Sequence, residues 1–140
     1  MHGGWDHLSA NTGPVLVLGF LTLVSGIARG LAATAVIWLV AGIGTWLVAG
    51  GNSVHIGASG LVFGWIVYLA IRGIVNRRLW EVVLGVVVLV VYGGVLLGVL
   101  PGQPGISWQG HLFGALGGAV AAVVVSDRRG EVVRGLARRG

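Results

Sequence analysis

Long apolar runs separated by short polar joints dominate this chain. Five runs can be drawn, at residues 8–28, 31–49, 57–75, 79–100 and 110–126. A helix needs about 20 residues to cross the hydrocarbon core of a bilayer, and about 17 to 25 are tolerated. Runs of this length predict an all-α membrane protein, a polytopic bundle of about five transmembrane helices.

The composition supports lipid rather than water as the surrounding solvent. Hydrophobic residues make up 56% of the 140 residues and charged residues only 9%, whereas a soluble domain carries about 25% charged residues. The apolar surface is therefore expected to face the bilayer. The chain has no cysteine, which excludes disulfides, thiolate metal sites and cysteine nucleophiles.

The basic residues are all arginines, and their positions predict the topology. They occur at alternate joints and in the tail: Arg29, Arg72, Arg77, Arg78, Arg128, Arg129, Arg134, Arg138 and Arg139. Cytoplasmic joints carry the excess of positive charge, so the amino-terminal segment and joints 50–56 and 101–109 are expected outside. We divide the chain into a transmembrane domain, 1–126, and a cytoplasmic arginine-rich tail, 127–140.

The formal charge of +5 also raises the alternative of a nucleic-acid partner. The arginines are not gathered into a patch with interleaved aromatic residues, as a nucleic-acid surface requires. Basic tails of this kind usually mark topology. The sequence therefore predicts a bilayer and membrane-protein partners, and no nucleic acid.

Glycine is unusually frequent, with 27 residues where about 7% is average. Among the pairs spaced four apart are Gly60 with Gly64 and Gly114 with Gly118. In lipid, small residues at this spacing bring helix backbones into close contact. The pattern predicts tight packing between runs 57–75 and 110–126, and taken alone it is more typical of helix packing without catalysis than of a catalytic site.

Ser59 and His111 stand near the outer ends of these same two runs. Ionisable residues within a membrane span are costly to leave unpaired and usually carry function. A serine hydroxyl becomes a nucleophile when a nearby base takes its proton, and the oxyanion then formed needs donors. Ser59 at a helix start supplies one unpaired backbone amide and the positive end of the helix dipole.

Three motifs resemble those of the rhomboid intramembrane serine proteases. The pattern Gly-x-Ser-Gly matches 57–60, and His-x-x-Gly-x-x-x-Gly matches 111–118. The third motif, His-x-x-x-Asn, matches 7–11. The motifs stand in the family's order, and the match covers nearly the whole chain.

The resemblance implies a role for each matched residue. Ser59 would be the nucleophile and His111 the general base, while His7 and Asn11, with the Ser59 amide, would form the oxyanion site. The four-residue spacing of His7 and Asn11 lets both side chains point one way from a helix. Phe63 falls where the family places an aromatic ring that packs on the catalytic histidine, and core packing explains Phe63 equally well.

The chain also departs from the family pattern. Rhomboids usually have a span before the His-x-x-x-Asn segment, followed by a membrane-lying loop with a Trp-Arg pair, and neither is present. We therefore expect that an earlier segment is missing from this sequence. Pro14 is typical of a first helical turn, and a helix beginning there would leave His7 outside it.

The resulting hypothesis is a bacterial cell-membrane endopeptidase that cleaves a peptide bond in or near a substrate's transmembrane segment, from the extracytoplasmic side. One alternative is a non-proteolytic rhomboid-like protein that binds client transmembrane segments. A small transporter is disfavoured because no acidic residue stands in mid-span, and Gly57 to Leu61 does not supply the nucleophile elbow of an α/β-hydrolase.

A metal site at the outer face is a further alternative. His2, His55 and Asp6 are all expected outside, but no span carries a zinc-binding pair such as His-Glu-x-x-His. The sequence predicts no metal and no small-molecule cofactor.

Overall fold

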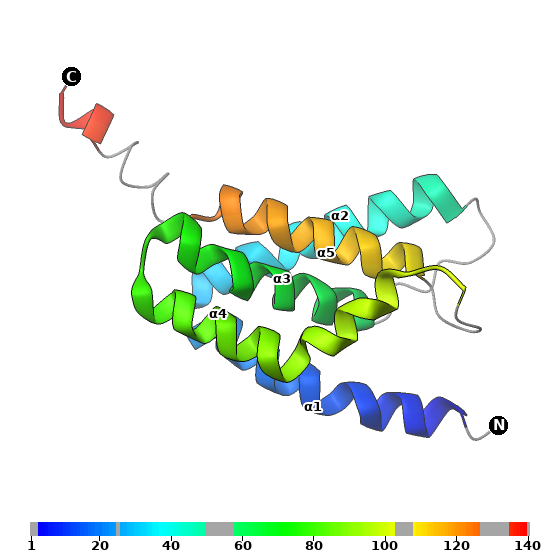
Figure 1. The fold of residues 1–140 in the computed structure, drawn as a ribbon. Helices are drawn as coiled ribbons and strands as arrows, with labels where there is room; N and C mark the ends of the chain where they lie inside the picture. The colour runs from blue at the N-terminus through cyan, green and yellow to red at the C-terminus, as the bar shows by residue number, and fades with distance from the viewer. Residues whose placement is uncertain (1–2, 25, 50–57, 103–107, 127–134, 140) are drawn as a thin grey trace.

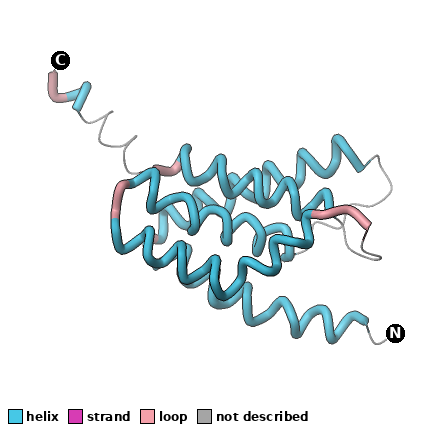
Figure 2. The backbone as a smooth tube through the Cα atoms, in the orientation of Figure 1, coloured by secondary structure: helices cyan, strands magenta, loops and turns pink. Residues whose placement is uncertain are grey.

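The described part of the chain consists of helices joined by short connections. The computed structural model describes residues 3–24, 26–49, 58–102, 108–126 and 135–139. Within these residues there is no strand (Figure 2), which confirms the all-α prediction. The elements are α1 (Gly3–Val24), α2 (Ile27–Ala49), α3 (Ala58–Asn76), α4 (Leu79–Tyr92), the 3₁₀ helix η1 (Gly93–Val99) and α5 (Trp108–Val124).

The outward surface of the bundle is apolar, as a membrane protein requires. Leu79 is 78% exposed and Val90 is 80% exposed, and such side chains match lipid rather than water. By length and composition, Ile27–Val48, Ala58–Asn76 and Leu79–Val99 can each cross a membrane. Two further apolar stretches, Ser9–Val24 and Trp108–Val124, are shorter. The structure is thus a helical membrane bundle, with three of the five predicted crossings at full length.

The central element is α3. It packs against α5, α4, α1 and α2 (Figure 1), and its buried side chains include Val62, Trp65, Ile66 and Leu69. Trp65 also donates a hydrogen bond of 3.0 Å from Nε1 to the hydroxyl of Thr34 on α2. Ser59 therefore belongs to the most enclosed helix of the bundle.

Two predicted boundaries were wrong. Arg29 was expected in the joint after run 8–28, but it lies in the first turn of α2, because Gly26 adopts a φ of 139° and separates the helices earlier. Run 79–100 was expected to be one helix, but its α-helical part ends at Tyr92 and continues as η1. The pair Gly93 and Gly94 stands at this change, and glycine is a poor α-helix former.

Pro14 lies inside α1, which begins at Gly3. The alternative in which a helix begins at Pro14 is therefore wrong, and His7 lies within the helix. Residues 50–57, 103–107 and 127–134 lie outside the described residues. The boundary between the transmembrane domain and the tail stays a prediction.

Candidate active site

Glycine residues bring the backbones of α3 and α5 into contact. A Cβ atom added to Gly114 would lie against the carbonyl group of Gly60, and one added to Gly118 would lie against that of Gly64. A Cβ on Gly64 would in turn stand 2.9 Å from the Gly114 carbonyl oxygen. The two helices therefore approach so closely that no side chain fits between them at these positions.

Ser59 and His111 flank one end of this crossing. Ser59 directly precedes Gly60 and His111 directly follows Gly110, and the Gly110 carbonyl oxygen lies 3.4 Å from the position of a Cβ on Gly60. Both Ser59 and His111 are half-buried. No hydrogen bond joins their side chains in the part of the chain that is described. The crossing thus sets the two residues at the same level of neighbouring helices.

The ring of His111 is held from two directions. It stacks on Phe63, with ring centroids 4.1 Å apart and an angle of 9° between the ring planes. Its Nδ1 lies 3.0 Å from the carbonyl oxygen of Gly98 in η1. Phe63 is only 3% exposed, so the stack rests on a side chain that is fixed in the core.

Ser59 is the second residue of α3. Its amide therefore belongs to the first turn, whose N–H groups have no partner within the helix. The positive end of the α3 dipole adds to the potential there. A carbonyl oxygen placed beside Ser59 would meet a donor and a favourable field for negative charge.

The predicted oxyanion residues lie on α1, which packs against α3 and α2 (Figure 1). His7 and Asn11 stand one helical turn apart, and Asn11 is half-buried. The side chain of His7 lies outside what the structure describes, so the approach of this pair to Ser59 stays a prediction.

The structure does not test the metal alternative. His2 and His55 lie outside them, as does the side chain of Asp6. Among the side chains that are described, no three metal-ligating groups come together.

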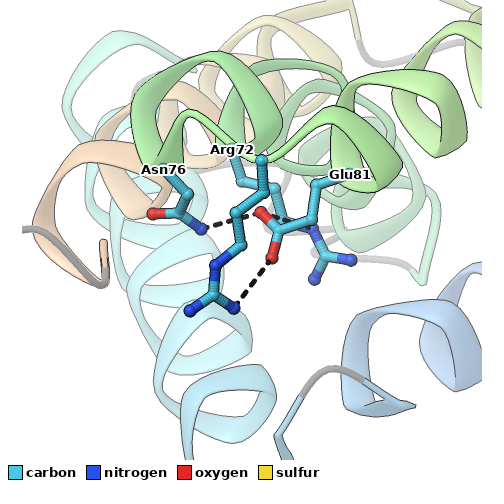
Figure 3. A network of polar contacts seen from close by, with 4 residues as sticks. Arg72, Asn76 and Glu81 are labelled. Atoms are coloured by element: carbon cyan, nitrogen blue, oxygen red, sulfur yellow. Dashed lines mark hydrogen bonds and ion pairs between the residues drawn. The ribbon is translucent and has the colours of Figure 1, made fainter.

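A polar cluster that was not predicted from the sequence lies at the other end of α3 (Figure 3). Glu81 on α4 accepts a hydrogen bond of 2.8 Å from Asn76, and its Oε2 lies 4.0 Å from Nε of Arg72. The Arg72 guanidinium lies over the rings of Tyr68 and Trp80, at 5.6 and 5.7 Å from their centroids. The spacing of Arg72 and Asn76, four residues apart on one helix face, was the available signal.

This cluster is buried although it is charged. Arg72 is 2% exposed and Glu81 is 1% exposed. Next to it, α3 and α4 touch through glycine, because a Cβ on Gly85 would stand 2.8 Å from the Leu69 carbonyl oxygen. The ion pair and this contact fix α4 on α3 at the end away from Ser59.

Comparisons with known proteins agree with this architecture. A family model described as the Rhomboid domain matches residues 1–128. Uncharacterized proteins of Mycobacterium tuberculosis and Mycobacterium bovis are each 52% identical over 134 residues, covering 90% of this chain and 56% of the relative. One of Mycobacterium leprae is 48% identical, covering 90% of this chain and 53% of the relative.

The chain therefore spans about half the length of the curated relatives that it matches. No solved structure matches it significantly. The family model covers nearly all of the helical bundle and both helices of the glycine crossing. The chain belongs to the rhomboid family of membrane proteins.

Proposed function

We propose that this protein is an intramembrane serine endopeptidase in which Ser59 is the nucleophile and His111 the general base. The observation that carries the proposal is the glycine crossing of α3 and α5, which sets Ser59 and His111 at one level of adjacent helices. Membership of a family that consists largely of serine proteases supports it. The substrate would be the transmembrane segment of another membrane protein.

The chemistry begins when Nε2 of His111 takes the proton of the Ser59 hydroxyl and Oγ attacks the carbonyl carbon of the scissile peptide. The oxyanion would be stabilised by the Ser59 amide together with His7 and Asn11. Collapse of this intermediate breaks the C–N bond, and the leaving amine takes the proton from His111. Water, activated by His111, then releases the acyl group from Ser59.

We propose a dyad of Ser59 and His111 rather than a triad because the acidic side chain that the structure describes, Glu81, lies far from His111. Glu81 is engaged with Arg72 and Asn76 at the opposite end of α3. Phe63 and the Gly98 carbonyl hold the His111 ring in place of a carboxylate. A dyad still gives an activated serine, provided that the ring is held in position.

Labelling with a fluorophosphonate probe tests the proposal. We expect the membrane-embedded chain to be labelled, and labelling to be lost in both Ser59→Ala and His111→Ala. Ser126→Ala, which removes a hydroxyl just beyond α5, is the matched control and should label normally. If the folded chain takes no label, either alone or with any upstream sequence of its gene, the proposal is wrong. The non-proteolytic binding of client segments would then be the better assignment.

A second prediction concerns the substrate. Helical carbonyl groups are hydrogen-bonded and shielded, so the substrate must unwind locally before Ser59 attacks. Replacing a glycine near the outer end of a cleaved test segment by alanine should slow cleavage about fivefold, because glycine destabilises a helix by about 1 kcal/mol. The same replacement near the inner end is the control. Equal rates for both segments would show that unwinding does not limit cleavage.

A further inference from the structure

The hydrogen-bond partner of His111 belongs to neither helix of the proposed dyad. It is the carbonyl oxygen of Gly98, 3.0 Å from Nδ1, on the 3₁₀ helix that continues α4. A carbonyl oxygen only accepts hydrogen bonds. In the neutral ring the proton must therefore be on Nδ1, which leaves the lone pair on Nε2 free to take a proton.

The local sequence explains why this carbonyl group is available. In a 3₁₀ helix the carbonyl of residue i accepts from the N–H of residue i+3, and Leu100 donates to Leu97 in this way at 3.1 Å. The next donor in this series would be Pro101, for the carbonyl of Gly98, but proline has no backbone N–H. Leu100 is already extended, with φ −78° and ψ 135°, as the residue before a proline prefers.

The close approach of the backbone also requires a glycine. A Cβ on residue 98 would lie 3.0 Å from Cζ of Phe63 and 3.3 Å from Nδ1 of His111. Gly93 and Gly94, in the same 3₁₀ helix, have nothing within 4 Å of an added Cβ. Of these three glycines in η1, only Gly98, whose carbonyl binds His111, leaves little room for a side chain.

We propose that Gly98 and Pro101 are positioning residues for the general base. Gly98 holds His111 in the tautomer with the proton on Nδ1, and Pro101 keeps the Gly98 carbonyl free to do so. After His111 takes the serine proton, the same contact becomes a charge-assisted hydrogen bond, which is stronger than a neutral one. The catalytic meaning of this pair rests on the proposed function, whereas the tautomer itself is independent of it.

The test uses the full chain with ¹⁵N-labelled histidine, at an alkaline pH where imidazole rings are neutral. We expect the ring-nitrogen signals of His111, assigned by their loss in His111→Ala, to show the proton on Nδ1. Pro101→Ala restores a backbone N–H that competes for the Gly98 carbonyl, so both tautomers should appear. Gly98→Ala should have the same effect, and Gly94→Ala should leave the native signal. Far-UV circular dichroism and thermal unfolding check each variant for folding.

Fluorophosphonate labelling supplies the functional readout. Labelling of Pro101→Ala should be about three- to tenfold slower than that of the native chain, the effect expected from one net hydrogen bond, with Gly94→Ala unchanged. A native His111 with its proton on Nε2 overturns the proposal, and so does a folded Pro101→Ala variant that keeps the proton on Nδ1. If Gly98→Ala does not fold, the tautomer of His111 in Pro101→Ala alone tests the proposal. Failure of the protease assignment would instead appear as an unlabelled native chain with the proton still on Nδ1.

Discussion

Replacement of Gly114 by alanine is expected to destabilise the bundle by about 3 kcal/mol or more, the upper part of the range for overpacked interiors. The added Cβ would lie against the carbonyl group of Gly60. This neighbour is backbone rather than a flexible side chain, so relief requires α3 and α5 to separate. Unfolding of the purified protein in detergent, followed by circular dichroism, measures the loss.

The control for this prediction is Gly13→Ala in α1, where nothing lies within 4 Å of an added Cβ. Alanine is about 1 kcal/mol better than glycine within a helix, so this variant should be as stable as the native chain or slightly more so. Equal stability of the Gly114→Ala and Gly13→Ala variants would contradict the tight crossing. A folded Gly114→Ala variant should also lose fluorophosphonate labelling, because Ser59 and His111 would move apart.

Removal of Glu81 by Glu81→Ala is expected to cost about 3 to 5 kcal/mol, since breaking a buried ion pair leaves one charge buried without its partner. Arg72 is 2% exposed, so its charge would stay buried after the carboxylate of Glu81 is removed. Asn76 loses its acceptor at the same time. Chemical or thermal unfolding in detergent again gives the change in free energy.

Two further variants show whether burial explains the effect. Arg78 is 44% exposed and its Nη1 lies 3.7 Å from Oε1 of Glu81, so Arg78→Ala should cost about 1 kcal/mol or less, as exposed pairs do. The double variant Arg72→Met with Glu81→Leu should recover most of the stability, because apolar residues often replace a buried pair without loss. If Glu81→Ala were no less stable than Arg78→Ala, the pair of Arg72 and Glu81 would have to be hydrated, and the prediction would be wrong.

The sequence predicted the helical membrane bundle because long apolar runs leave few other solutions. It could not place the break between α1 and α2 at Gly26 or the end of α4 at Tyr92, since glycine inside an apolar run is compatible with both a packed helix and a break. Arg72 was interpreted only as a marker of topology. Its burial depends on α4 folding back to bring Glu81 close to it. A local sequence pattern does not indicate such a contact.

The candidate site, too, could be predicted from the sequence only in part. The motifs drew attention to Ser59 and His111 because each stands beside a glycine pair at the start of its helix. The contact of His111 with Gly98 joins residues thirteen positions apart in the sequence, and it depends on the change from α4 to a 3₁₀ helix. Tertiary contacts of this kind become visible only once the helices are assembled.

The glycine crossing and the buried ion pair constrain evolutionary change differently. Where Gly114 meets the carbonyl of Gly60, neither helix offers a side chain that a second mutation can shrink. Gly114 is therefore expected to remain glycine as long as the fold is kept. Arg72 and Glu81, by contrast, are two side chains that can be exchanged together for an apolar pair. We therefore expect paired substitutions to be tolerated at the end of α3 that carries Arg72, and a substitution of Gly114, near Ser59, to be excluded.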